Sequence, residues 1–151
     1  MTGIAVGIVD TPLLPAMGVG PVSASGHGAQ VQFWGLVRDV HEGRRVLAVT
    51  YDAFRTLAEA TLRTIALEAR ARFGPGLSVA VYHRIGRLPV GEASVVVGVG
   101  SLHREAAYQA SRQVIEEIRV RLPVRKQEHY SDGNGAWLAG HSLRPDAREG
   151  R

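Results

Sequence analysis

A single lysine, Lys126, stands in a chain that carries seventeen arginines. Arginine stays protonated in proteins, whereas lysine can lose its proton and then act as a base or a nucleophile. Because this chain uses arginine wherever only positive charge is needed, its one lysine is a candidate for chemistry that a guanidinium group cannot perform. Lys126 is therefore the first candidate catalytic residue.

Three arginines lie close to Lys126 on either side of Pro123, namely Arg119, Arg121 and Arg125. The helix dipole favours basic residues at the C-terminal end of a helix, so the cluster is compatible with an ordinary helix end. It is equally compatible with the rim of a pocket that binds an anion. The charge pattern alone does not separate these two interpretations.

Two further basic sites lie at predicted ends of strands. His103-Arg104 stands where an apolar strand gives way to a helix, and the first N–H groups of a helix favour an anion. Two basic side chains are unfavourable at that end of a helix unless a bound phosphate reverses the sign of the interaction. Arg38 ends another predicted strand, where it could meet a ligand or be an ordinary surface arginine.

Composition excludes several classes of chemistry. Cysteine is absent, which removes disulfides, thiolate metal sites and cysteine nucleophiles, so any sulfur must come from elsewhere. The six histidines form no i,i+4 pair and have no carboxylate at metal-ligand spacing, so we expect no metal and no cofactor.

The net charge of +4 favours an anionic partner or is a mild excess of solvated arginine. No apolar run is long enough to span a membrane and no signal-peptide pattern is present, so a cytoplasmic location is expected.

Apolar periodicity predicts the elements that position these residues. Strands are expected over 4–9, 29–38, 46–54, 77–84, 93–101 and 124–130, and helices over about 56–73 and 103–122. Thr56 to Glu59 has the pattern of a capping box, and Pro123 ends the second helix. We expect a turn at 41–44, a mobile loop at 18–28, a loop at 87–92, one strand face shared by Val31, Phe33 and Val37, and a final anchor at Trp137.

Strands and helices alternate along the chain, with one tight hairpin and two main helices. This order predicts a single α+β domain with a mixed or antiparallel sheet. Within residues 1–151 we expect a variable N-terminal strand and loop at 1–28, a catalytic core at 29–138, and a polar tail at 139–151.

Six segments follow one another in the order of a known family: Phe33 to Arg38 (FWGLVR), Val49 to Asp52 leading into Leu57-Ala58-Glu59, His83 to Glu92 (HRIGRLPVGE), His103 to Ala107 (HREAA), Leu122 to Glu128 (LPVRKQE), and Asp132-Gly133 before Trp137. From about Gly28 to Trp137, the chain resembles the large, catalytic subunit of molybdopterin synthase, the MoaE family. Each segment alone is weakly informative, whereas the ordered set is specific.

The resemblance implies an α/β hammerhead-type fold and a homodimer with a small ubiquitin-like subunit docked at each end. It also implies a sulfurtransferase. The C-terminal glycine thiocarboxylate of the small subunit would enter a pocket and deliver sulfur to a cyclic pyranopterin monophosphate. Two such transfers would give the dithiolene of molybdopterin.

The same resemblance assigns roles to residues of this chain. Lys126 matches the catalytic lysine, acting as an acid and base or stabilising an acyl intermediate, with Arg119 and His103 as the other catalytic candidates. The substrate would be bound next to the amine by Leu36, Val37, Arg38, His103, Arg104, Arg119, Lys126, Gln127 and Glu128.

The chain departs from the family pattern at three positions. Arg119 replaces a common second lysine, which keeps the charge but not proton exchange at neutral pH. Arg125 stands where tryptophan is usual, and Asp52 where glutamate is common. Two alternative functions therefore stay open: a diverged paralogue with weak turnover, and a non-catalytic nucleic-acid-binding module using the arginine cluster. Few aromatic residues for base stacking lie near that cluster.

Overall fold

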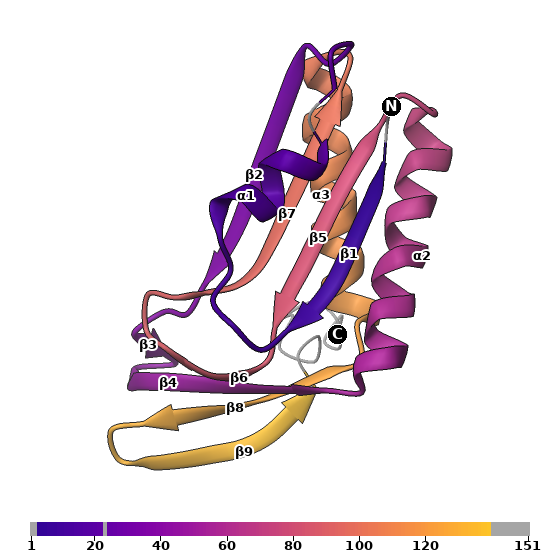
Figure 1. Cartoon of the computed structure of the whole chain (residues 1–151). Helices are drawn as coiled ribbons and strands as arrows, with labels where there is room; N and C mark the ends of the chain where they lie inside the picture. The colour runs from indigo at the N-terminus through magenta and orange to yellow at the C-terminus, as the bar shows by residue number, and fades with distance from the viewer. Residues whose placement is uncertain (1–2, 23, 140–151) are drawn as a thin grey trace, which may run out of the picture.

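The computed structural model describes residues 3–22 and 24–139, which form two sheets that meet at an angle (Figure 1). The first sheet has the strand order β1-β5-β7-β2. Its strands are β1 (Ile4–Val9), β5 (Ser78–Arg84), β7 (Ala93–Ser101) and β2 (Ala29–Leu36). β1 pairs with β5 in parallel, and the other two pairs are antiparallel, so the predicted mixed sheet is confirmed.

The second sheet runs across one end of the first sheet, with its strands transverse to those of the first (Figure 1). Its strands follow the order β3-β4-β8-β9, and β6 pairs with β4 as well. The bounds are β3 (Val40–His41), β4 (Arg44–Ala53), β6 (Gly86–Pro89), β8 (Val124–Tyr130) and β9 (Gly133–Ala139). The predicted turn at 41–44 is confirmed as a hairpin, in which Glu42 and Gly43 both have positive φ.

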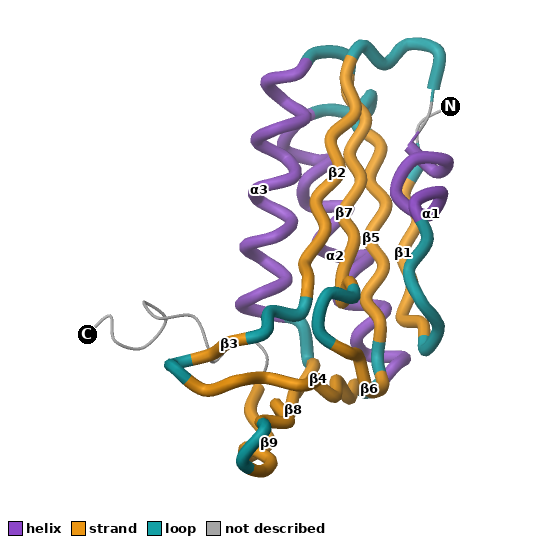
Figure 2. Tube along the Cα trace, turned by 90° about the vertical axis from the view of Figure 1, so that its left-hand side faces the viewer, coloured by secondary structure: helices purple, strands orange, loops and turns teal. Residues whose placement is uncertain are grey.

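Two long helices, α2 (Arg55–Phe73) and α3 (Arg104–Arg121), cover one face of the first sheet (Figure 2). Their buried stripes pack on valines of β5 and β7 and form the main core. The apolar periodicity predicted these stripes correctly, including Leu62 and Ile65 of α2 and Val114 of α3, which are at most 1% exposed. The α+β class with two main helices is therefore confirmed.

Two expectations at helix and loop positions are wrong. α2 begins after Phe54 without a side-chain cap, so Thr56 lies inside the first turn and forms no capping box. Residues 86–89 form β6 rather than a loop, because their backbone completes hydrogen bonds along β4.

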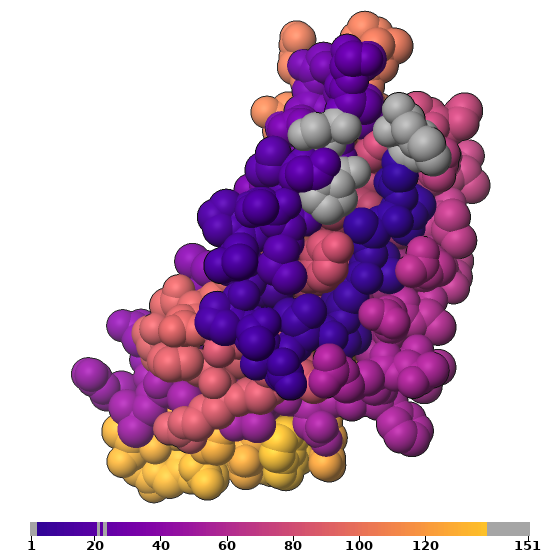
Figure 3. All heavy atoms as spheres, in the orientation of Figure 1, coloured from indigo at the N-terminus to yellow at the C-terminus, as the bar shows by residue number. Residues whose placement is uncertain are grey.

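The segment predicted as a mobile loop at 18–28 contains regular structure where it is described. The short helix α1 (Pro15–Val19) and a 3-10 turn at Gly20–Val22 lie on the sheet face opposite α2 and α3 (Figures 2 and 3). Val22 is 1% exposed, so this segment contributes to the core rather than hanging free.

Two apolar residues lie elsewhere than expected. Val37 follows a register shift at the end of β2 and packs with Val46, Val49 and Leu88 in a second cluster, away from Val31 and Phe33. Trp137 is 40% exposed on β9, a strand that was not predicted, and is no buried anchor. The expected tail at 139–151 lies outside the described residues from 140 onward.

The close approach of α1 to β7 leads to a test of this packing. A methyl group at Gly98 would overlap the carbonyl oxygen of Gly18, whereas nothing lies within 4 Å of one at Gly76. Since α1 must move to admit the methyl group, we expect Gly98→Ala to lower the free energy of unfolding by about 1–3 kcal/mol. Chemical denaturation measures this, with Gly76→Ala as the matched control. Equal stability of the two variants would contradict the described position of α1.

Candidate active site

A cavity of about 620 Å³ lies where the two sheets meet, beside the last turns of α3. Both sheets and α3 contribute to its lining, which includes Phe33, Gly35, His83, Ser94, Val95 and Val97 of the first sheet, Ile115, Ile118 and Arg119 of α3, and Tyr51, Val124 and Lys126 of the second sheet. Leu36 at the end of β2, Arg38 in the connection that follows, and His41 of β3 also line it. The cavity therefore exists only because the second sheet crosses the end of the first.

Lys126 extends from β8 directly opposite Tyr51 of β4. Its side chain is 19% exposed, and its Nζ lies 3.8 Å from Oε2 of Glu128, two residues along the same strand face. Burial lowers the pKa of Lys126, and the positive charges of Arg38 and Arg119 act in the same direction. Glu128 opposes this shift. The amine consequently gives up its proton more readily than an ordinary lysine does.

Glu128 is a buried carboxylate held by several neighbours. It is 9% exposed, accepts a short hydrogen bond from the Tyr130 hydroxyl, and lies 3.9 Å from Nε2 of His41. Burial and this hydrogen bond raise the pKa of Tyr130 to about 12, so the hydroxyl keeps its proton and continues to donate. Because the carboxylate is fixed in this way, it provides Lys126 with a stationary counter-charge.

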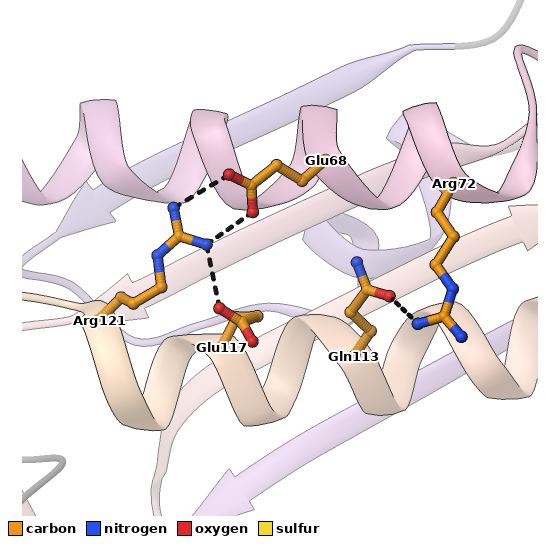
Figure 4. A network of polar contacts seen from close by, with 5 residues as sticks. All are labelled: Glu68, Arg72, Gln113, Glu117 and Arg121. Atoms are coloured by element: carbon orange, nitrogen blue, oxygen red, sulfur yellow. Dashed lines mark hydrogen bonds and ion pairs between the residues drawn. The ribbon is translucent and has the colours of Figure 1, made fainter.

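The basic cluster around Pro123 divides into one cavity residue and two structural ones. Arg119 lines the cavity, whereas Arg121 binds Glu68 of α2 and Glu117 of α3 and so joins the two helices (Figure 4). Arg125 pairs with Asp52 at 3.1 Å, and its guanidinium lies 4.6 Å from the centre of the Trp137 ring. Arg121 and Arg125 thus have structural partners, whereas Arg119 lines a pocket, and the binding of an anion there stays a prediction.

Three other predicted substrate ligands do not line the cavity. The Val37 side chain is buried, and its backbone N–H and carbonyl bind Glu92 and Gly91 at 2.9 and 2.8 Å. Gln127 alternates to the face of β8 opposite Lys126 and donates to the carbonyl of Gly135. Glu128 contacts Lys126 and is not among the residues that line the cavity. Of the predicted ligands, Leu36, Arg38, Arg119 and Lys126 do line it.

His103 and Arg104 lie at the far end of α3. His103 is its N-cap residue and Arg104 its first residue, and both are exposed. The fifteen helical steps from Arg104 to Arg119 span about 22 Å at 1.5 Å per residue. The structure therefore does not bring these two residues to the cavity of their own chain.

Sequence reasoning missed His83 and Tyr51, which line the cavity together. Their rings meet edge to face with centres 5.1 Å apart, and burial raises the pKa of the Tyr51 hydroxyl. Burial lowers the pKa of His83 to about 4, so its ring is neutral at physiological pH. The signal was the segment HRIG, which supported the family resemblance but was given no chemical role.

Comparison with known proteins decides the family. The profile of the MoaE protein family matches residues 9–121, which is most of the chain. The chain belongs to the MoaE family. A relative from Synechococcus elongatus, named molybdopterin synthase catalytic subunit, is 43% identical over 122 residues, covering 81% of this chain and 74% of that protein. A relative of the same name from Halalkalibacterium halodurans is 37% identical over 133 residues, covering 88% and 85%.

Solved structures agree with this MoaE assignment. Molybdopterin synthase from Staphylococcus aureus matches with a TM-score of 0.84 at 32% identity, covering 88% of this chain and 96% of that chain. A chain from the complex of subunits 1 and 2 of molybdopterin-converting factor from Helicobacter pylori matches with a TM-score of 0.70, covering 91% of each chain. At 16% identity, that second match shows a shared fold alone.

The single lysine permits a direct test of the electrostatics. Selective ¹³C labelling of lysine gives one side-chain resonance, whose pH titration reports the pKa of Lys126. Since Glu128 raises that pKa against burial, we expect Glu128→Gln to move the titration midpoint to lower pH. Asp132→Asn is the matched control, because Asp132 is an exposed carboxylate that pairs with Arg44. An unchanged or higher midpoint in Glu128→Gln would show that Glu128 is not the counter-charge.

Proposed function

We propose that this chain is the sulfur-transferring subunit of a molybdopterin synthase, acting on a cyclic pyranopterin monophosphate. One observation carries the proposal: the amine of Lys126, lowered in pKa by burial, faces a cavity that Arg38 and Arg119 also line, in a chain of the MoaE family. Both anions of the reaction, a thiocarboxylate and a phosphate, need cationic partners. Three such partners surround this one cavity.

The sulfur in this proposal comes from a partner chain, because this chain has no cysteine. The thiocarboxylate sulfur of the small ubiquitin-like subunit attacks a pyranopterin carbon that carries an oxygen of the cyclic phosphate. The carbon–sulfur bond forms as that carbon–oxygen bond breaks, the oxygen stays on the phosphate as its ring opens, and the tail and the substrate are joined as a thioester. Water then attacks the thioester carbonyl, the carbon–sulfur bond to the tail breaks, sulfur stays on the substrate, and the tail leaves as a carboxylate. The relative from Synechococcus elongatus at 43% identity is named the catalytic subunit of molybdopterin synthase, a name that implies a further subunit and supports such a partner.

Lys126 suits the hydrolytic half of this sequence. As an ammonium group it stabilises the negative oxygen that forms when water attacks the carbonyl, and as a free amine it accepts a proton from that water. Because its pKa is lowered, Lys126 gives up its proton more readily than an ordinary lysine, a proton exchange that a guanidinium group does not perform. Arg119 and Arg38 then act as fixed cations for the phosphate.

The predicted roles of His103 and Arg104 require a second copy of the chain. These exposed residues lie about 22 Å of helix away from Arg119, so they bind substrate only in the cavity of another protomer. This geometry supports the homodimer that the family resemblance implies. A site shared between protomers also explains two basic residues at the N-terminal end of a helix, where the dipole opposes them.

The contacts of the arginine cluster argue against the nucleic-acid-binding alternative. Arg121 and Arg125 are already paired with carboxylates, and Arg119, although exposed, lines the cavity. No helix of the described residues is long and apolar enough to cross a membrane. The cytoplasmic location stays a prediction.

The other alternative is a diverged paralogue with weak turnover. Single-turnover kinetics of the unmodified chain separates such a paralogue from an active enzyme.

The first test of the function replaces Lys126. With the thiocarboxylated small subunit and cyclic pyranopterin monophosphate, we expect Lys126→Ala to lower the rate of molybdopterin formation at least 1000-fold, since the acid and base is lost. Lys126→Arg keeps the charge but not proton transfer and is expected to stay at least 100-fold slow. Arg112→Ala, which removes an exposed cation on α3, is the control. Full activity of Lys126→Arg would show that Lys126 contributes only its positive charge and no proton transfer.

The second test concerns the shared site. Lys126→Ala and His103→Ala protomers are each expected to be nearly inactive as homodimers. In a heterodimer of the two, one cavity keeps its own Lys126 and receives His103 from the other protomer, so about half of the normal turnover per dimer returns. Purification of doubly tagged heterodimers and a turnover assay measure this. No recovery in a confirmed heterodimer would remove His103 from the neighbouring cavity.

A further inference from the structure

His83 has no part in the sulfur-transfer chemistry described above, yet it lines the same cavity. The residue is 6% exposed, and its ring lies against Tyr51, the cross-strand neighbour of Lys126. It stands in register with Val95 of β7, which in turn is opposite Gly35 of β2. Residues in register share a sheet face, so His83 belongs to the part of the cavity wall that the first sheet supplies.

The protonation state of this ring is fixed by its surroundings. Nδ1 lies 2.9 Å from the carbonyl oxygen of Arg84, which can only accept a hydrogen bond, so Nδ1 carries the ring hydrogen. Burial lowers the pKa of His83 to about 4, and the second nitrogen therefore stays unprotonated. Nε2 is left as a hydrogen-bond acceptor with no hydrogen of its own.

That acceptor remains open to the cavity. Among the described residues, only Nε of Arg84 is a fully buried side-chain nitrogen or oxygen without a partner. Nε2 of His83 has no described hydrogen bond, yet it is not among the fully buried atoms without a partner. It is therefore accessible from the cavity that His83 lines. A histidine with a purely structural role would normally satisfy both ring nitrogens when buried.

The cations and His83 divide the cavity by hydrogen-bonding character. Arg38, Arg119 and Lys126 present donors, which suit the anionic groups of a ligand. The hydroxyl of Ser94 donates to the carbonyl oxygen of Gly35, and that of Tyr51 hydrogen-bonds with Ser94, so both already have partners within the chain. Nε2 of His83 can only accept, and a fixed polar group of this kind rejects a ligand that lacks the matching donor.

We propose that His83 is a specificity residue, whose Nε2 accepts a hydrogen bond from a ring N–H of the pterin heterocycle while the arginines hold the phosphate. This inference rests on the proposed function and adds to it the recognition of the heterocycle. A pterin carries N–H groups on its ring edge, whereas its phosphate carries only acceptors at neutral pH. The glycine amide of the incoming tail is a second source of N–H, and the test distinguishes the two.

The test uses two substitutions that differ in which nitrogen they imitate. His83→Asn keeps a side-chain N–H near Nδ1, which preserves the bond to Arg84, but has no group at the position of Nε2. His83→Gln places an amide at the position of Nε2, where its oxygen can accept. Thermal unfolding confirms that both variants fold. The probes are inorganic phosphate, a stable pterin monophosphate, and a peptide ending in Gly-Gly, each titrated calorimetrically into the full-length protein.

We expect His83→Asn to weaken binding of the pterin monophosphate about tenfold or more, because the ring N–H loses its partner. Affinity for inorganic phosphate and for the Gly-Gly peptide should stay within about twofold, and His83→Gln should recover most of the lost pterin affinity. In turnover assays, the Asn variant should show a raised KM for the pterin with a smaller change in kcat.

Three results would overturn the role of His83. These are unchanged pterin affinity in His83→Asn, an equal loss of affinity for phosphate and pterin, and a loss confined to the Gly-Gly peptide. In each case the unmodified protein still binds the pterin, so the proposed function survives. If the unmodified protein binds the pterin monophosphate no more tightly than inorganic phosphate and forms no product, the function and this inference fail together.

Discussion

The arrangement of this protein depends on keeping one ammonium group in a place that disfavours its charge. Lys126 is mostly buried beside two arginines, and both conditions oppose protonation. Glu128 is the opposing influence, and it is effective because Tyr130 and the surrounding strands hold the carboxylate near Nζ. The pKa of the amine is thus set by a balance in which no single neighbour dominates. Because burial is the largest influence, the amine gives up its proton more readily than an ordinary lysine does.

That balance requires the crossing of the two sheets. β4 pairs with β8 along most of its length and with β6 beside it, which fixes the second sheet across the ends of β5 and β7. Lys126 and Tyr51 then face the end of the first sheet instead of solvent, and Arg119 reaches the same space from the last turns of α3. The ion pair of Arg121 with Glu68 and Glu117 ties α3 to α2 close to this point (Figure 4). Arg121, on one side of the helix end, has a structural role, and Arg119, on the other side, faces the cavity.

The sequence predicts well the elements that follow from a local pattern of residues. It predicts less well the elements that form only through pairing with a distant part of the chain. The stripes of α2 and α3 follow from helical period, whereas β6 becomes a strand only because β4 lies beside it. In the site, composition alone identified Lys126. The separation of Arg119 from Arg121 was also accessible, since two residues are about 200° apart around a helix. Strand alternation likewise places Gln127 opposite Lys126 and Glu128. His83 was not accessible, because its burial and its tautomer depend on strand register and on the carbonyl of Arg84.

One chain contains only part of the chemistry attributed to it. The cavity supplies an amine, two guanidinium groups and, in His83, a fixed acceptor, but it holds no sulfur, since the chain has no cysteine. The two basic residues at the start of α3 cannot reach their own cavity across a helix of eighteen residues. Under the proposed function, a sulfur source and a second set of phosphate ligands would both come from other chains. Assembly would then be a condition of catalysis, because the reacting groups would meet only when a small-subunit tail and a second protomer approach the same cavity.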